Sequence, residues 1–230
     1  MTRKINPTSL RLGLTQVWDF TIPNYNSFNS YILLIFKWLQ VNSIIIKILR
    51  SNKFLISDKE LLYINNKLFL NIYITDLILP SHDKYFLITH KLSKILLEWF
   101  SLKICLRIYR KMNYTIMPNL ILNYAAYLLE YNRNPNKIIW QVYQLLKGHI
   151  NSSKIIYCTK GIRLVYLKGF KIQLVGRFDN TKSQMAKSIQ QNLGSLSLVS
   201  LKSYVEFSHK NLHTKLGSCG LKVWLFYEIN

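Results

Sequence analysis

Glycine is almost missing from the first two thirds of this chain, and its absence limits how the backbone can hold a polyanion. The 230-residue sequence contains 8 glycines, and none occurs between Gly13 and Gly148. Phosphate-binding loops and the GXXG clamp of KH domains need glycine, because only glycine lets the main chain approach phosphate that closely. Any polyanion must therefore be held mainly by side chains.

The charge of the chain predicts such a polyanionic partner. The sequence has 31 Lys and Arg against 10 Asp and Glu, a formal net charge of +21. A compact chain of this charge repels itself unless a phosphate-rich partner neutralises it. The excess is +9 over residues 151–230, from 12 basic and 3 acidic residues. We therefore expect nucleic-acid binding, with a merely solvated basic surface as the alternative.

The composition predicts a packed protein in a reducing compartment. Half of the residues are hydrophobic, which is enough for two compact units. Cys105, Cys158 and Cys219 are isolated, without the spacing of a zinc knuckle or a disulfide framework. The chain starts without a secretory signal or a transit peptide, and abundant Ile, Asn, Lys and Tyr are typical of A/T-rich codons. Both features favour a protein encoded and made inside an organelle, with an A/T-rich nuclear or bacterial genome as the alternative source of this composition.

The hydrophobic pattern predicts an α+β chain without internal repeats. Helices are expected from Ser27 or Ser30 to about Arg50, from His82 or Asp83 to Trp99, from Pro118 to about Tyr131, from Pro135 to about Lys147, and over the short segment Ser183–Gln191. Strands are expected at Leu68–Leu79, Leu102–Tyr109, Ile162–Leu167, Phe170–Val175, Lys202–Phe207 and Leu221–Tyr227. Residues 148–160 are predicted to be a polar break.

The apolar stretch over residues 31–46 is predicted to be a core helix rather than a membrane span. Lys37, Gln40 and Asn42 interrupt it well short of the roughly 20 apolar residues that a span needs. Basic residues flank aromatic ones there, so a helix lying on a membrane surface is the alternative.

The sequence lacks the patterns of catalytic or metal-binding residues. Its acidic residues are scattered and no serine lies in a GxSxG elbow, so we predict no catalytic residue, metal or cofactor. His209 and His213 lie four residues apart, but Lys210 and Lys215 beside them disfavour zinc. These histidines are left as phosphate contacts or ordinary surface residues.

A dense basic run lies in the C-terminal half. It comprises Lys168, Lys171, Arg177, Lys182 and Lys187, with Phe170 and Phe178 interleaved. Such a surface can neutralise several phosphates, and planar Arg can stack on splayed bases. We favour RNA contact over strand positions that merely face solvent, because acidic residues are scarce nearby.

Both ends of the chain resemble the universal small-subunit ribosomal protein 3 family. Lys4–Leu14, followed by Trp18, is similar to its N-terminal signature, K-[VI]-x-P-x-x-x-R-L-G with a tryptophan shortly after. Ile172–Arg177 and Gly194–Phe226 are similar to its C-terminal domain, which ends here in the run GLKVWLF over Gly220–Phe226.

The resemblance implies an α+β fold in which a degenerate type II KH-like domain is followed by a C-terminal α+β domain with a mixed or antiparallel sheet. It implies a basic arm over residues 1–20, the KH-like domain over 21–111 and the C-terminal domain over 112–230. Pro80–Thr89 occupies the place of the GXXG loop without a glycine, so we expect a scaffold rather than an RNA clamp. Residues 149–168 exceed the family's usual connection and have no predicted role.

The resemblance also implies the binding residues and partners. Contacts with small-subunit rRNA are predicted at Arg3, Lys4, Arg11, Lys168, Lys171, Arg177, Lys182, Lys187, Lys202, Lys210 and Lys215. Arg133 and Lys137 would keep part of a basic cluster near the channel through which mRNA enters, whereas Trp224 and Phe226 are interpreted as structural.

The expected protein is a non-catalytic constituent of the head of a mitochondrial small ribosomal subunit. Its expected partners are rRNA, mRNA and neighbouring head proteins, with no membrane. The rival hypothesis is a free-standing RNA chaperone or regulator, which the missing GXXG loop disfavours.

Overall fold

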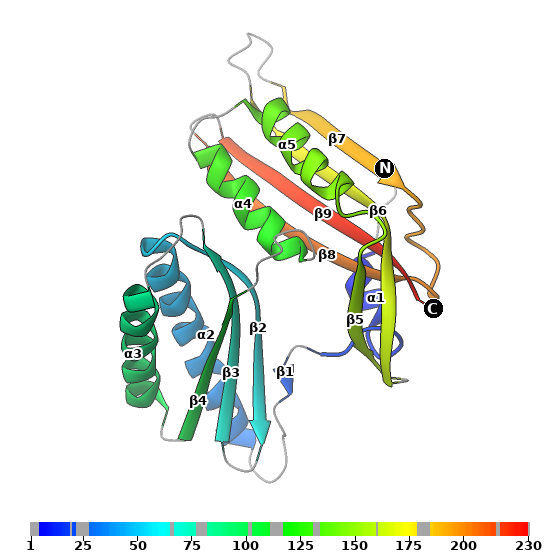
Figure 1. Ribbon diagram of the computed structural model, residues 1–230. Coiled ribbons are helices and arrows are strands. Elements are labelled where there is room, and N and C mark those ends of the chain that lie inside the picture. The colour runs from blue at the N-terminus through cyan, green and yellow to red at the C-terminus, as the bar shows by residue number, and fades with distance from the viewer. Residues whose placement is uncertain are drawn as a thin grey trace. The chain divides into compact units, whose positions relative to one another are not determined.

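The computed structural model describes residues 5–18, 20–21, 28–64, 67–76, 82–100, 103–110, 117–130, 134–159, 161–178, 185–214 and 217–229. They form two compact units, one from residues within 18–112 and the other from residues within 1–17 and 113–230. Each unit is a sheet whose longer helices lie on one face, and each has its own hydrophobic core (Figure 1). The predicted α+β class is confirmed.

The 18–112 unit contains a four-stranded sheet and two long helices. Its elements are β1 (Phe20–Thr21), α2 (Phe28–Ser51), β2 (Phe54–Ile64), β3 (Lys67–Asp76), α3 (His82–Trp99) and β4 (Lys103–Arg110). The strand order is β1-β2-β3-β4. β2 and β3 form an antiparallel hairpin, whereas β3 and β4 run parallel and are joined through α3. The strand, helix and strand predicted at Leu68–Leu79, up to Trp99 and from Leu102 are present in that order as β3, α3 and β4, while residues 77–81 lie outside the described part of the chain.

The helices of this unit follow the predicted apolar spacing. Trp38, Val41, Ile45 and Leu49 recur every three or four residues along α2 and are buried, as expected for one face of a helix that packs on a sheet. They share a core with Ile88, Leu92 and Leu96 of α3 and with Leu68, Leu70, Ile72 and Ile74 of β3. The prediction of a core helix over residues 31–46 therefore holds for this face of α2.

The other side of α2 is apolar and exposed. Ile32, Leu33, Phe36 and Leu39 are each 47–60% accessible. The stretch Tyr31–Ser51, with a mean hydropathy of 1.8, also has the length and composition of a membrane-crossing helix.

β2 is an element that the hydrophobic pattern did not predict. Its sequence, FLISDKELLYI, places Ser57, Asp58, Lys59 and Glu60 in the middle of the strand. The pairing with β3 also shifts between Ile56 and Lys59. A bulge of this kind breaks the two-residue alternation by which a strand is recognised.

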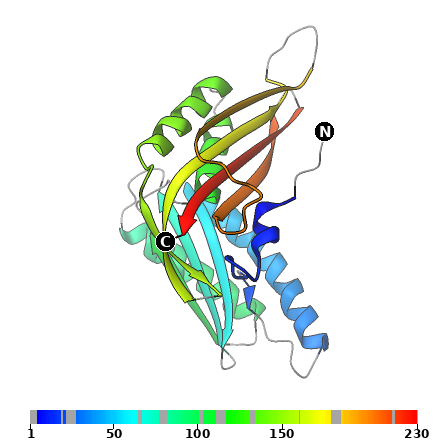
Figure 2. The same ribbon diagram turned by 90° about the vertical axis from the view of Figure 1, so that its right-hand side faces the viewer.

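The second unit is built on a five-stranded antiparallel sheet. Its elements are α1 (Pro7–Arg11), α4 (Pro118–Glu130), α5 (Pro135–Lys147), β5 (Ser153–Cys158), β6 (Gly161–Gly176), β7 (Lys187–Gly194), β8 (Tyr204–Thr214) and β9 (Gly217–Ile229). The order is β5-β6-β9-β8, and β7 pairs with the second half of β6. α4 and α5 cover one face, and α1 lies against β8 on the opposite side of the sheet (Figure 2).

The core of this unit lies between the sheet and α4 and α5. Alternate residues of the two central strands, Phe170, Ile172 and Leu174 of β6 and Leu221, Val223 and Leu225 of β9, pack against the helices. The strand β6 continues through a bulge between Leu167 and Gly169. There the backbone of Gly194 approaches so closely that a Cβ would lie 2.0 Å from the Lys168 carbonyl oxygen, and the φ of Gly194 is +79°.

Three sequence predictions for this unit need correction. The helix predicted over Ser183–Gln191 is wrong, because residues from Lys187 form the edge strand β7 and pair with β6. The two strands predicted at Ile162–Leu167 and Phe170–Val175 are one strand. The polar break predicted over residues 148–160 contains β5. The segment 149–168, which had no predicted role, therefore contributes residues 153–158 and 161–168 to a hairpin of β5 and the first half of β6.

The described residues 5–17 belong to this second unit, in the region where the resemblance implied a basic arm over residues 1–20. α1 packs against β8, and the Gln16 side-chain amide donates to the Val205 carbonyl oxygen. The Thr159 hydroxyl donates to the Leu14 carbonyl oxygen at 2.7 Å. Polar contacts of this kind, between segments far apart in the chain, leave no periodic signal in the sequence.

Candidate nucleic-acid interface

The sheet of the second unit has one face that no helix longer than α1 covers in the described part of the chain. Because side chains alternate along a strand, the residues next to those in the helix-covered core point the other way. We call this side the open sheet face, and it carries Lys171, Gln173, Ser188, Gln190, Asn192, Phe207, His209, Asn211, Lys222 and Trp224.

Aromatic and cationic side chains meet across the strands of the open sheet face. Trp224 lies opposite Lys171 on one side and Phe207 on the other. The Lys171 ammonium is 5.6 Å from the centre of the Trp224 ring, and the Phe207 and Trp224 ring centres are 5.2 Å apart. His209 stacks on Phe207 with ring centres 5.9 Å apart. Lys171, Trp224 and Phe207 are half-buried and His209 is exposed.

The charge on this face has one sign. Lys171, Lys222 and His209 are its basic residues, and none of its ten residues is acidic. The nearest acids along the same strands are directed elsewhere, since Glu206 accepts a hydrogen bond from Lys154. Glu228 lies at the far end of β9, with a carboxylate oxygen 3.9 Å from the Lys168 ammonium nitrogen. Phosphate would therefore meet attraction without a competing carboxylate.

Other predicted rRNA contacts lie around this sheet rather than on its open face. Lys168 and Lys202 line a cavity of about 330 Å³ together with Ser195, Ser197, Ser200, Ser203 and Glu228. Arg177 follows β6 directly, and Lys187 begins β7. Lys210 points to the helix-covered side, where its ammonium donates to the Asn123 side-chain oxygen of α4 at 2.8 Å.

Arg11 was predicted to contact rRNA, and the structure corrects this prediction. Its side chain is fully buried, and its guanidinium donates to the carbonyl oxygens of Ser200 at 2.7 Å, Ser203 at 2.8 Å, Leu198 at 2.9 Å and Pro7 at 3.0 Å. Burial lowers the pKa of this guanidinium from its ordinary value. Because its donors are occupied by the backbone of residues 197–203, Arg11 fixes that segment instead of binding phosphate.

The remaining predicted contacts are only partly described. Lys137 is exposed in the first turn of α5. Arg3, Lys4, Arg133, Lys182 and Lys215 lie outside the described residues. Among the residues that the structure describes, no group of three or more His, Cys, Asp and Glu is placed to hold a metal ion.

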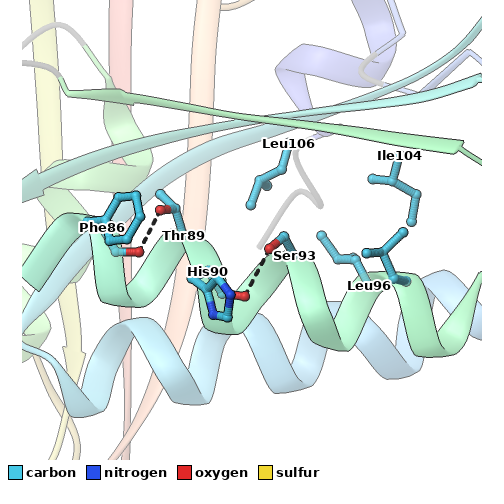
Figure 3. A pocket seen from close by; sticks show the side chains of 8 residues that line it. Phe86, Thr89, His90, Ser93, Leu96, Ile104 and Leu106 are labelled. Carbon is cyan, nitrogen blue, oxygen red and sulfur yellow. Dashed lines mark hydrogen bonds between the residues drawn. The ribbon is translucent and has the colours of Figure 1, made fainter.

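The 18–112 unit carries a separate groove between α3 and the edge strand β4. It has a volume of about 340 Å³ and is lined by Phe86, Thr89, His90, Ser93, Leu96, Leu97, Ile104 and Leu106. Thr89 and Ser93 donate their hydroxyl hydrogen bonds to the helix carbonyls of Phe86 and His90, at 2.8 and 2.9 Å (Figure 3). The lining contains no lysine or arginine, so this groove offers little attraction to phosphate.

Sequence reasoning missed the exposed position of Trp224. Phe226 is buried, as expected of a structural aromatic, but Trp224 is half-buried on the open sheet face. The alternation Lys222, Trp224 against Val223, Leu225 was a usable signal. It became informative only once α4 and α5 identified the covered face.

The whole chain is similar to small-subunit ribosomal proteins from organelles and bacteria. It is 41% identical to "Small ribosomal subunit protein uS3m" of Chondrus crispus over 231 residues, which cover 99% of this chain and 94% of that protein. It is 27% identical to uS3c of Euglena longa, covering 98% of this chain and 99% of that protein. It is 24% identical to uS3 of Borreliella afzelii, covering 98% of this chain and 71% of that protein.

A comparison with protein-family models finds no match. The family assignment therefore depends on the similarity to the Chondrus crispus protein, which extends over nearly the full length of both chains. The motifs that the sequence analysis found at the two ends lie within this similarity. The chain belongs to the family of small ribosomal subunit protein uS3.

Proposed function

We propose that this protein is a structural, rRNA-binding constituent of the mitochondrial small ribosomal subunit, without catalysis of its own. The observation that carries the proposal is the near full-length similarity to uS3m of Chondrus crispus. The net charge of +21 supports it independently, because phosphate neutralisation supplies much of the affinity of proteins for RNA.

Within the subunit, the second unit holds the rRNA in this proposal. Its exposed cations lie on the open sheet face and around the cavity that Lys168 and Lys202 line. Lys171 lies in β6, Arg177 comes directly after β6, and Lys187 begins β7. Lys210 of β8 is oriented toward α4. Arg3, Lys4, Lys182 and Lys215 remain proposed contacts on the strength of the sequence alone.

The finer placement in the head of the subunit is also part of the proposal. Lys137, exposed in the first turn of α5, and Arg133 just before it would lie near the channel through which mRNA enters. The 18–112 unit would act as a scaffold for neighbouring head proteins, since its groove between α3 and β4 has no cationic lining.

Sedimentation tests the proposal directly. Mitochondria purified from the source organism are lysed, and an antibody against this chain follows it through a sucrose gradient. We expect the protein to migrate with the small subunit in moderate salt and to leave that position after RNase treatment. Recovery only in light fractions would refute the ribosomal function and favour a free-standing RNA chaperone or regulator, and recovery only with membranes would favour a lipid-binding role.

A further inference from the structure

The open sheet face keeps large aromatic rings accessible although the hydrophobic core of the unit lies on the other side of the sheet. Trp224 and Phe207 belong to none of the buried residues that pack against α4 and α5. Their ring centres lie 5.2 Å apart on adjacent strands. Two half-buried rings side by side, tilted by 34° to each other, form an apolar platform, and the exposed face of an aromatic ring favours a planar ligand.

Polar side chains surround this platform on the same face. Lys222 and His209 lie directly opposite each other in the row next to Trp224 and Phe207. On the same face, the neighbouring strands β6 and β7 contribute Gln173, Gln190 and Asn192. The amides carry both donors and acceptors, so they suit the edges of nucleotide bases, whereas Lys171 and Lys222 suit phosphate.

We propose that the open sheet face binds unpaired nucleotides of RNA, with a base stacked on Trp224 and phosphates held by Lys171 and Lys222. This inference depends on the proposed rRNA-binding function and specifies which form of RNA the site takes. The Lys171 ammonium, now 5.6 Å from the Trp224 ring centre, is at the end of a flexible chain and can move to a phosphate when a base takes its place.

The chemistry of the platform selects unpaired over double-stranded RNA. In a duplex the faces of the bases are already stacked on one another, so only phosphates and the groove edges are accessible. A purely electrostatic site would need no aromatic platform, and Lys171 and Lys222 would bind either form. An unpaired strand, in contrast, satisfies both the rings and the cations.

A binding assay with matched RNAs tests this. The full-length chain is titrated into fluorescein-labelled oligouridylate of about 12 nucleotides, a length within the range that one OB fold covers, and into a duplex with the same number of phosphates. We expect Trp224→Leu to weaken binding of the single strand roughly 5-fold to 100-fold and to leave duplex binding unchanged. Lys222→Gln should weaken both and reduce the salt dependence of single-strand binding by about 0.7 of a log unit per log unit of salt.

Two further variants separate stacking from folding. Trp140→Leu removes another exposed tryptophan, 55% accessible on α5 at the helix-covered side, and should bind both RNAs like the wild type. Phe207→Leu should weaken single-strand binding in the same direction as Trp224→Leu. If Trp224→Leu and Phe207→Leu both bind the single strand like the wild type, or lose single-strand and duplex affinity equally, the platform does not stack bases and the inference is overturned.

The assembled subunit gives the second readout and identifies the occupant. After ultraviolet irradiation of purified small subunits and digestion with RNase and trypsin, we expect nucleotide adducts on the peptides of residues 203–210 or 223–230, which contain Phe207 and Trp224. Cross-links from Lys222 to another ribosomal protein, without nucleotide adducts on these peptides, would overturn the inference. Co-sedimentation with the small subunit would still stand in that case, so the proposed function and this site fail separately.

Discussion

Replacing Arg11 should destabilise the second unit instead of weakening RNA binding. The side chain is fully buried, and four of its hydrogen bonds to backbone carbonyls are 3.0 Å or shorter. Hydrogen bonds that involve a charged group contribute about 1.5–3 kcal/mol each. The sum overstates the loss, because water can reach some of the freed carbonyls and the burial cost of the charge disappears. We therefore expect Arg11→Met to lower the free energy of unfolding by about 3–5 kcal/mol.

Thermal unfolding of the full-length chain measures this loss. Followed by circular dichroism and tryptophan fluorescence, the transition of the second unit should shift down by about 10–15 °C. Arg11→Lys should lie between the wild type and Arg11→Met, because an ammonium has three donors and lacks the planar fork of guanidinium. Trypsin should also cut faster after Lys202, since the backbone of residues 197–203 loses its anchor.

The control for lost charge is Arg163→Met, which removes a half-exposed arginine from β6 in the same unit. It should unfold near the wild-type temperature. If Arg11→Met unfolded like the wild type but bound rRNA more weakly with a smaller salt dependence, Arg11 would contact phosphate and the reasoning from its burial would be refuted.

Two further predictions concern stability. Burial, with the nearby charge of Arg50 as a smaller cause, lowers the pKa of Lys59 from 10.5 to about 8; the unfolded chain then binds more protons, so stability should rise with pH between about 8 and 10.5. In urea titrations, Lys59→Met should remove the rise of stability with pH and should increase the free energy of unfolding by on the order of 1–3 kcal/mol at pH 7. An unchanged pH profile would contradict this. In the same assay, Gly194→Ala should lower the free energy of unfolding by more than about 2 kcal/mol, because its Cβ would meet the Lys168 carbonyl oxygen. Gly13→Ala, at a nearly equal φ of +80° but with no atom within 4 Å of the added Cβ, should cost only about 1 kcal/mol, and equal losses would show that the clash is unimportant.

Much of the fold follows from local sequence rules. α2, α3, α4 and α5 begin and end within one or two residues of the predicted limits, because serine, asparagine and proline at their starts and regular apolar spacing act locally. β3, β4, β8 and β9 were predicted at overlapping positions for the same reason. Local rules are sufficient wherever the apolar period is unbroken.

The elements that were missed depend on contacts that the sequence does not display. The β7 sequence, KSIQQNLG, has little β propensity, yet its backbone pairs along β6 from Gly169 to Gly176. β2 contains four consecutive polar residues and a bulge, which together remove its alternation. In both cases a neighbouring strand supplies hydrogen bonds that override a weak local preference.

For the candidate site too, the sequence predicts which residues are charged but not which way their side chains point. Counting charges marks Arg11, Lys210 and Lys171 alike as contacts for phosphate. The structure buries Arg11 under backbone carbonyls, turns Lys210 toward Asn123 of α4 and leaves Lys171 above Trp224. The sign of a residue's charge can be read from the sequence, but its access to RNA depends on which side of the sheet it occupies.

The N-terminal segment determines which part of the open sheet face is accessible. The resemblance implied a basic arm that contacts rRNA, but Arg11 holds residues 197–203, and Gln16 holds the backbone of Val205 on β8. Val205 and Phe226, at the same end of the open sheet face, are buried, whereas Phe207 and Trp224, two residues away on their strands, and His209, four residues away, remain accessible. The arm thus closes one end of the face and leaves the aromatic and cationic end open. Destabilising the arm through Arg11→Met should uncover Val205 and Phe226 without adding cations, so it should not create a stronger RNA site.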